Sequence, residues 1–261
     1  MVERVVVASR AADGESPLDE AGQLALRHGG DGLWIDEAGF ALLRGTDLDL
    51  AVAPDTRGHG VGTALASAAL TEAPADVTAW SHADHPAAAA LARRLGFVAA
   101  RALWVMEREA SPVEVPHVAG VTIRGYRETD ADEVLRVNAA AFAHHPEQGS
   151  LDAAGLAERM AEPWFDPAGL LVADSGDGLL GFHWTKQHSD VVGEVYVVAV
   201  DPAAQGRGLG KALTAAGLAH LASLGVRRII LYVESDNTAA IATYAGLAFA
   251  NASTHVQYAR P

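Results

Sequence analysis

The chain has 261 residues, of which 50% are hydrophobic and 20% charged, so it is long enough for two globular domains. Its formal net charge of −14 argues against nucleic acid and anionic membranes as partners, because both would repel it. Since the sequence contains no cysteine, disulfides, thiolate metal sites and cysteine nucleophiles are excluded.

The N-terminal segment carries charges too early for a signal peptide, and no run of 18 apolar residues occurs. The 11 histidines show no His-x-x-x-His or His-Glu-x-x-His spacing. We therefore expect a cytoplasmic protein, with no metal and no membrane partner, and we expect a monomer.

In the first half of the chain, the hydrophobic pattern predicts a small α/β domain. Residues before about 30 look helical and lack an opening strand. We then expect a hairpin over 32–37 and 40–44, a strand over 47–52 and a helix over 60–71. A strand over 77–81 and a helix over 86–94 follow, and a final pair of strands ends near residue 108. Residues 110–120, with two prolines and little periodicity, read as a linker.

The second half of the chain predicts a second α/β domain with a more complete set of strands and helices. We expect a strand over 121–126, helices over 130–142 and 151–160, and a hairpin over 170–173 and 179–186. A strand over 194–200, a glycine loop, a helix, a strand over 228–233 and a helix over 237–244 follow. A last hairpin ends near residue 260. Alternating strands and helices indicate an α/β fold.

An internal repeat sets the expected domain count. Residues 51–65 match residues 199–213 at 8 of 15 positions without a gap, and the copies lie 148 residues apart. This distance is typical of two fused copies of one small domain. We expect a first domain over 1–109, trimmed at its start, a linker over 110–120 and a second domain over 121–261.

The repeated element carries a glycine loop, Gln205-Gly206-Arg207-Gly208-Leu209-Gly210, between a strand and a helix. Such a loop turns backbone N–H groups toward one point at a helix N-terminus, which favours a phosphate. A Walker A loop would need a glycine in place of Gln205 and a hydroxyl in place of Ala212. A dinucleotide site would need Gly-x-Gly-x-x-Gly spacing and an acid about 20 residues later, but the first acid is Glu234.

The pattern Gln/Arg-x-x-Gly-x-Gly/Ala after a strand instead resembles the pyrophosphate loop of the GNAT family of acyl-CoA N-acyltransferases. This resemblance implies two tandem GNAT domains, each a mixed, mostly antiparallel sheet flanked by helices. It also implies acetyl-CoA as co-substrate, and a bulge near residues 198–200 where the strand splays from its neighbour.

Acyl transfer to an amine needs a base for the ammonium and an acid for the leaving thiolate. Glu194 begins the strand before the loop and could act as the base, although strand-end acids are often simply solvated. Tyr244 offers a hydroxyl for the thiolate, but it could equally be a half-buried helix aromatic.

Further stretches are similar to the mycothiol synthase family of tandem GNAT enzymes. The resemblance is carried by Leu135-Arg136-Val137-Asn138, His145-Pro146-Glu147-Gln148-Gly149, Trp164-Phe165-Asp166-Pro167, Gly181-Phe182-His183-Trp184-Thr185-Lys186, Gly193-Glu194-Val195-Tyr196-Val197 and Leu231-Tyr232-Val233-Glu234-Ser235-Asp236-Asn237. It implies acetylation of the cysteinyl amine of desacetylmycothiol, with Glu194 as general base and Tyr244 as general acid. The implied substrate contacts are Glu20, Glu147, Lys186, Glu194 and Tyr232.

The implied acetyl-CoA contacts fall in both copies. In the second copy they are Val198, Ala199, Val200, Gln205, Gly206, Arg207, Gly208, Leu209, Gly210, Lys211, Asn237, Thr238, Ala239, Ala240, Ile241 and Ala242. In the first copy they are Leu50, Ala51, Val52, Gly58, His59, Gly60, Val61, Gly62 and Thr63.

The first copy keeps the glycines of the loop but not the proton-transfer groups. Aligning the copies puts Thr46 opposite Glu194, Ala92 opposite Tyr244 and His85 at the place of Asn237. We expect this copy to bind a CoA-type ligand without catalysis. A tandem GNAT enzyme acting on another amine, such as a protein N-terminus or an aminoglycoside, and a non-catalytic acyl-CoA sensor remain alternatives.

Overall fold

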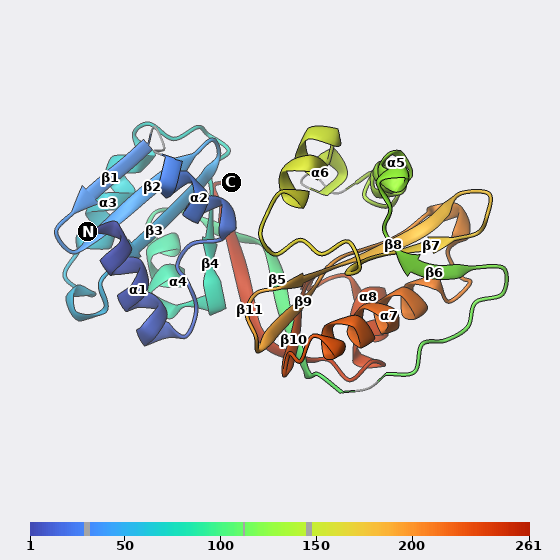
Figure 1. The fold of residues 1–261 in the computed structure, drawn as a ribbon. Coiled ribbons are helices and arrows are strands. Elements are labelled where there is room, and N and C mark those ends of the chain that lie inside the picture. The colour runs from blue at the N-terminus through green and yellow to red at the C-terminus, as the bar shows by residue number, and fades with distance from the viewer. Residues whose placement is uncertain (29–31, 112, 145–147) are drawn as a thin grey trace. The chain divides into compact units, whose positions relative to one another are not determined.

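The computed structural model describes residues 1–28, 32–111, 113–144 and 148–261, which form two compact units (Figure 1). The first unit contains Met1–Trp104, Glu234–Asp236 and Ser253–Pro261, and the second contains Val105–Val233 and Asn237–Ala252. Neither unit is one continuous stretch, because residues 234–236 and 253–261 belong to the first unit although they follow residues of the second. Strands β5 (Val98–Glu109) and β11 (Ala250–Ala259) each begin in one unit and end in the other.

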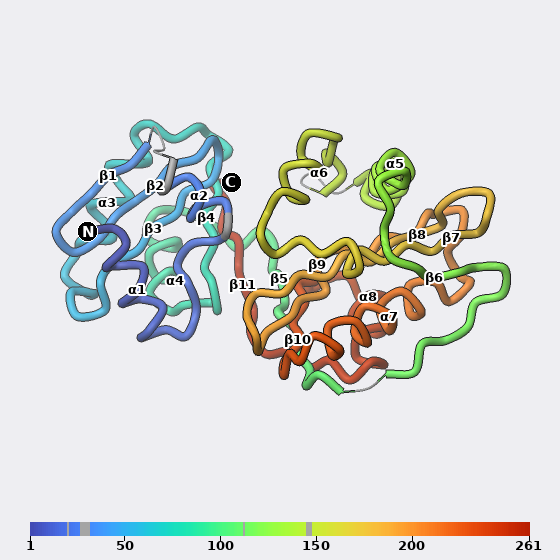
Figure 2. Tube along the Cα trace, viewed as in Figure 1, coloured from blue at the N-terminus to red at the C-terminus, as the bar shows by residue number. Residues whose placement is uncertain are grey.

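The sheet of the first unit contains strands in the order β1-β2-β3-β4-β11. Strands β1 (Gly32–Asp36), β2 (Gly39–Arg44) and β3 (Asp47–Val52) are antiparallel neighbours, and β4 (Thr78–Ser81) runs parallel to β3. The end of β11 pairs antiparallel with β4, with Val256 opposite Ser81. Figure 2 shows the red end of the trace beside the first unit. The last residues of the chain therefore complete the sheet of its first unit.

Alternation along β2 divides the core of this unit between the two faces of the sheet. Phe40 and Leu42 pack with Val5 and Leu18 beneath helices α1 (Val2–Asp13) and α2 (Glu20–His28). Ala41 points the other way, into the cluster around α3 (Val61–Leu70) and α4 (Pro86–Arg94). Because successive strand residues face opposite sides, one apolar run supplies both layers.

Two predicted hairpins are wrong. Residues 98–109 form the single strand β5, and residues 250–259 form the single strand β11. The sequence of β5 contains no Gly, Pro, Asn or Asp that would favour a turn, so nothing in it interrupts the extended backbone.

The second unit has an antiparallel series β6 (Thr122–Gly125), β7 (Leu170–Asp174), β8 (Leu179–Gln187) and β9 (Val192–Val200), with β10 (Arg228–Glu234) parallel to β9. Helix α5 (Ala131–Ala141) packs on one face of this sheet, next to α6 (Ala153–Met160), while α7 (Leu209–Ser223) packs on the other (Figure 1). Helix α8 (Thr238–Ala245) follows β10. Trp184 and Phe182 lie in the core beneath α5, and Leu209 and Leu213 form the core under α7.

Strand β9 has the irregular pairing that positions the site. Trp184 pairs with Val197 and Thr185 pairs with Val195, so Tyr196 is the extra residue of a bulge. On the other edge, pairing with β10 ends at Leu231 opposite Val195. The splay expected at residues 198–200 is present, but the bulge lies two residues before Val198 rather than within that stretch.

Candidate active site

The glycine loop of the second unit adopts the conformation that an anion site requires. Gly206 and Gly208 have φ angles of 76° and 80°, a region that favours glycine. Gly208 is the N-cap of α7, and the helix begins at Leu209. The N–H groups of the first helical turn therefore lack intrahelical acceptors and lie at the positive end of the helix dipole. This geometry can hold a phosphate through the backbone.

The exposed edge of β9 lies beside this loop. Val198 and Val200 pair with β8 through His183 and Gly181 on one edge, whereas the edge toward β10 has lost its pairing beyond Val195. Strand edges bind extended chains through backbone hydrogen bonds. The splay thus offers a place for a ligand that carries amide groups.

Asn237 ends the irregular segment before α8. Its Oδ1 accepts a hydrogen bond from the backbone N–H of Ala240, at 3.1 Å, which makes it the helix cap. The residues predicted to follow it along the cofactor, from Thr238 to Ala242, form the first turns of α8.

The two proposed proton-transfer groups lie on different elements of the second unit. Glu194, on β9, is 6% exposed, and its Oε2 accepts a hydrogen bond from Nε2 of His188, at 2.5 Å. Tyr244, on α8, lies half-buried with its ring 5.9 Å from that of Phe249. Burial raises the pKa of the Tyr244 phenol above its ordinary value, which keeps the hydroxyl protonated. A protonated hydroxyl is what a general acid requires.

Lys186 pairs with Glu194 across β8 and β9, so the structure brings these two predicted residues together. The Lys186 ammonium lies 4.5 Å from the ring centre of Trp164 and 5.1 Å from that of Tyr196. Such contacts stabilise a cation that is removed from water. The roles of Trp164, Tyr196 and His188 were not predicted. Trp164 and Tyr196 lie within the quoted resembling stretches, but His188 carried no sequence signal.

The other predicted substrate contacts are less completely described. Tyr232 is 42% exposed and follows Leu231, the last residue of β10 that pairs with β9. Glu147 lies outside the described residues. Glu20 begins α2, but its side chain is not among those described.

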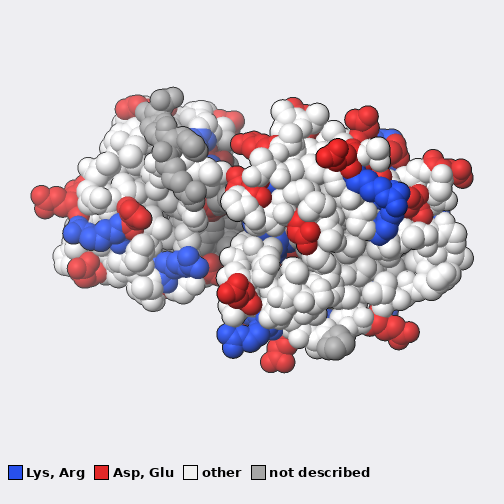
Figure 3. All heavy atoms as spheres, in the orientation of Figure 1, with Lys and Arg blue, Asp and Glu red and all other residues white. Residues whose placement is uncertain are grey.

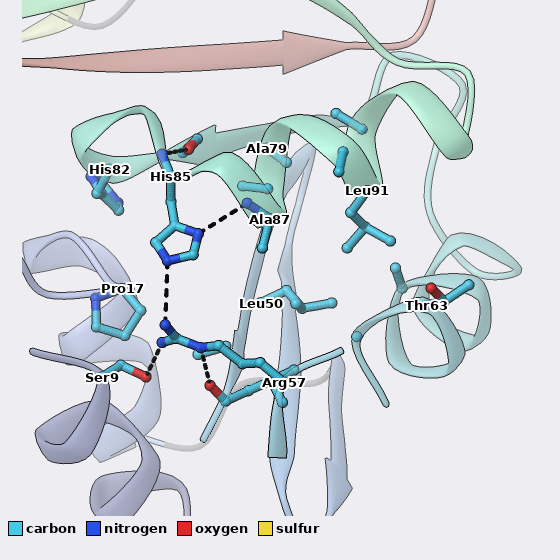
Figure 4. Close-up of a pocket in the computed structure, with 18 of the residues that line it drawn as sticks. Ser9, Pro17, Leu50, Arg57, Thr63, Ala79, His82, His85, Ala87 and Leu91 are labelled. Atoms are coloured by element: carbon cyan, nitrogen blue, oxygen red, sulfur yellow. Dashed lines mark hydrogen bonds between the residues drawn. The ribbon is translucent and has the colours of Figure 1, made fainter. Parts of the chain in front are cut away.

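The first unit contains a cavity of about 420 Å³ at the equivalent splay, since β3 pairs with β4 only through Asp47 and Thr78 (Figure 4). The predicted residues that line it are Leu50, Ala51, Val52, Gly58, Gly60, Val61, Gly62 and Thr63. His59 is not part of the lining, and its Nδ1–H donates to the Thr56 carbonyl, at 3.2 Å.

His85 caps α4 as Asn237 caps α8, because its Nδ1 accepts the Ala87 backbone N–H at 3.2 Å. Nε2 lies 3.6 Å from Asp13 Oδ1 and faces the Arg57 guanidinium (Figure 4). The cap position of the repeat is therefore filled by a different side chain in each unit.

Arg57, the first residue of the loop in this unit, is held by two hydrogen bonds to Asp13, each 2.7 Å long. The hydrogen bonds from Arg57 hold the pKa of the Asp13 carboxyl below its usual range. Because Asp13 offsets the charge of Arg57, an anion in this cavity would depend mainly on the backbone N–H groups of the loop.

The proton-transfer positions of the first unit carry other residues. Ala92, opposite Tyr244 in the repeat, is buried and lines the cavity. The nearby carboxyl of Asp49 does not line it, and a Cβ built on Gly22 would lie 3.0 Å from its Oδ2. Burial raises the pKa of Asp49 to about 6 although Arg44 lies 2.8 Å away. Asp49 thus belongs to a covered ion pair and not to the cavity.

On the face that Figure 3 displays, the Lys and Arg side chains lie apart from one another among acidic ones. None of the helices within the described ranges has the length and apolar character needed to cross a bilayer. Within those same ranges, no group of three or more His, Asp or Glu side chains could hold a metal ion.

Comparison with known proteins gives the class of this fold and site. The Acetyltransferase (GNAT) family matches residues 22–97 and 138–249. A GCN5-related N-acetyltransferase from Sphaerobacter thermophilus superposes with a TM-score of 0.75 at 22% identity, covering 99% of this chain and 91% of that one. A tandem GNAT protein from the clavulanic acid biosynthesis pathway gives a TM-score of 0.68 at 19% identity, covering 98% and 94%. The fold is that of tandem GNAT acetyltransferases.

Closer relatives refine this class. The mycothiol acetyltransferase of a Nocardioides species is 58% identical, covering 99% of this chain and 96% of that protein. The mycothiol acetyltransferase of Nocardia farcinica is 46% identical, covering 99% and 92%. The chain belongs to the mycothiol acetyltransferase branch of the GNAT family, and it is an acyltransferase.

Proposed function

We propose that this chain transfers the acetyl group of acetyl-CoA to the cysteinyl amine of desacetylmycothiol, giving mycothiol and CoA. The observation that supports this substrate is the sequence similarity to relatives named mycothiol acetyltransferase, which are 58% and 46% identical over nearly the full chain. The acetyl donor follows from the GNAT family and is supported by the loop and splay in each unit.

The proposed reaction is a direct attack. Glu194 accepts one proton from the substrate ammonium, and the free amine attacks the thioester carbonyl. Backbone N–H groups at the open edge of β9 would stabilise the oxyanion. When the C–S bond breaks, Tyr244 donates its proton to the CoA thiolate and regains one from the nitrogen. The amide keeps a single hydrogen, so the second ammonium proton ends on CoA and the first reaches solvent.

The proposed binding residues fall into two groups, one for acetyl-CoA and one for the acceptor amine. Acetyl-CoA would lie along residues 198–200, the loop 205–211 and the start of α8, with its pyrophosphate at the N-terminus of α7. Lys186, Glu194, Tyr232, Glu147 and Glu20 would contact the acceptor. In support of this assignment, Lys186 and Glu194 are both 6% exposed on one face of the sheet. A buried polar group left without a partner is costly, so two such side chains favour a polar acceptor.

We further propose that the first unit holds a CoA-type ligand without catalysing transfer, and that the protein is a cytoplasmic monomer. The cavity at the loop of the first unit supports the binding role, and Thr46 and Ala92 at the proton-transfer positions support the lack of catalysis. Gel filtration with light scattering tests the oligomeric state.

The decisive experiment is acetylation of an amine panel by the full chain with acetyl-CoA, followed by mass spectrometry. The panel contains desacetylmycothiol, an aminoglycoside and a peptide with a free N-terminus. We expect acetylation of desacetylmycothiol at its cysteinyl nitrogen with much higher kcat/KM than the others. Preference for another amine would show a different acceptor, and acetyl-CoA binding without turnover of any amine would indicate a sensor.

A further inference from the structure

The carboxylate of Glu194 has a histidine partner that the proposed reaction has not yet used. The Glu194 side chain is 8% exposed, whereas the His188 ring, 2.5 Å away, is 39% exposed. The contact therefore joins a buried acid to a group in reach of solvent. It lies at the end of the strand pair that carries Lys186 and Glu194.

The chain fixes this contact through a tight turn. Strand β8 ends at Gln187, and the backbone N–H of His188 donates to the Val192 carbonyl at 2.9 Å. The Ser189 hydroxyl accepts the backbone N–H of Val192, at 3.2 Å, which closes the turn. Because both ends of the turn are hydrogen-bonded, the backbone position from which the His188 ring reaches Glu194 is fixed.

The chemistry of the pair fixes the positions of the protons. An ionised carboxylate can only accept hydrogen bonds, so Nε2 of His188 must carry the hydrogen. That bond occupies Oε2 of Glu194 and restricts rotation of the carboxylate. The lone pairs that remain on the carboxylate, those of Oε1 among them, are left to take a proton from an amine, and their direction is set by the imidazole.

Lys186 is the cross-strand partner of Glu194, and its ammonium lies over the rings of Trp164 and Tyr196. Within the described residues, His188 supplies a hydrogen bond to the Glu194 carboxylate from Nε2. An N–H bond from a planar ring fixes the direction of the carboxylate that accepts it.

We infer that His188 is a positioning residue for acetyl transfer, which acts through Glu194 by orienting the carboxylate toward the substrate ammonium. This inference rests on the proposed function, because it needs Glu194 to be the base. The effect should fall on the chemical step, since His188 contacts Glu194 rather than the loop that would hold acetyl-CoA.

The test compares two amides at position 188 in the full-length protein. The amide nitrogen of His188→Gln reaches about as far as Nε2, while that of His188→Asn stops near Nδ1 and cannot reach Glu194. We expect His188→Gln to keep kcat within about threefold of the original and His188→Asn to lose about 10- to 100-fold, the scale of a misplaced catalytic group. The KM for acetyl-CoA should not change in either variant.

A double variant separates positioning from an independent role. If His188 acts only through Glu194, His188→Asn should cause no further loss in a Glu194→Gln background. An additive loss there, or equal rates for the Gln and Asn variants, would overturn the inference while the function stands. An original protein that does not acetylate desacetylmycothiol, or a Glu194→Gln variant with full activity, would instead overturn the proposed function or the base on which it rests.

Discussion

Lys186 and Glu194 are direct partners in the antiparallel pairing of β8 with β9, and only 6% of each residue is exposed. Directly opposed residues of an antiparallel pair project from the same face of the sheet. Two residues of opposite charge thus lie next to each other in the sheet, and the Lys186 ammonium contacts the rings of Trp164 and Tyr196.

Removing the proposed base or acid should slow the chemistry without releasing the cofactor. We expect Glu194→Gln and Tyr244→Phe each to lower kcat by about 10²–10⁴-fold, the usual contribution of a general base or acid. Calorimetric titration should give nearly unchanged acetyl-CoA affinity, because neither group belongs to the glycine loop. If both variants turned over as fast as the unsubstituted protein, under conditions where chemistry limits the rate, the assignment of base and acid would be contradicted.

Lys186 should contribute to use of the acceptor and not of acetyl-CoA. We expect Lys186→Met to lower kcat/KM for desacetylmycothiol by the equivalent of about 1–3 kcal/mol, the cost of leaving a buried polar partner unpaired. Glu147→Ala should act in the same direction. Trp164→Phe is the matched control, since it keeps a ring beneath the ammonium and should cost less than Lys186→Met. Unchanged kinetics in the Lys186 and Glu147 variants would count against this acceptor.

The two glycine loops should bind CoA independently. Gly60 and Gly208 occupy equivalent positions with φ angles of 90° and 80°, so a side chain there strains the loop. We expect Gly60→Asp to remove one of two CoA equivalents and to leave turnover largely intact, whereas Gly208→Asp should abolish turnover. Calorimetric stoichiometry and steady-state rates measure both. If Gly60→Asp stopped residual turnover in a Glu194→Gln/Tyr244→Phe background, the first unit would be catalytic.

Stability should fall at mildly acidic pH because of a buried histidine. His183 is 0% exposed, its Nδ1–H donates to the Leu213 carbonyl at 2.9 Å, and burial lowers its pKa from 6.5 to about 4. Since the folded state disfavours the charged ring, this contribution is present above pH 6.5 and is lost as the pH falls toward 4. The change is at most about 3 kcal/mol.

Urea unfolding between pH 8 and pH 4.5 would measure this loss. His183→Asn is the matched variant, because it keeps an N–H donor for Leu213 but does not titrate. Its stability should depend less on pH than that of the original chain. An equal pH dependence for the two proteins would show that other groups cause the loss.

Gly217 should be sensitive to the smallest substitution. A Cβ at this position would lie 2.0 Å from Cε1 of His183, whereas a Cβ at Gly210 would meet only Val200, at 3.8 Å. We expect Gly217→Ala to destabilise the fold by about 1–3 kcal/mol, the usual cost of overpacking, and Gly210→Ala to have little effect on stability. Thermal unfolding of both variants measures the difference, and equal midpoints would contradict it.

The sequence by itself determined most of the helices and strands, and the repeat. The apolar run at Phe40, Ala41 and Leu42 predicts a strand of a hairpin, and the structure places those residues on a strand whose two faces lie in separate cores. The glycines at 206 and 208 predict a turn into a helix, because few other residues adopt positive φ at low cost. These properties depend on neighbouring residues, so a local pattern is enough to reveal them.

The tertiary structure decided what depends on distant segments. The pairing of β11 with β4 requires residues far apart in the chain to meet. The register shift at Tyr196 and the aromatic contacts of Lys186 depend on how neighbouring segments pack. The bond from His188 to Glu194 spans only six residues, yet it depends on how the turn between two paired strands directs a ring. Strand register and side-chain direction are set by packing across the whole sheet, and a one-dimensional pattern does not contain them.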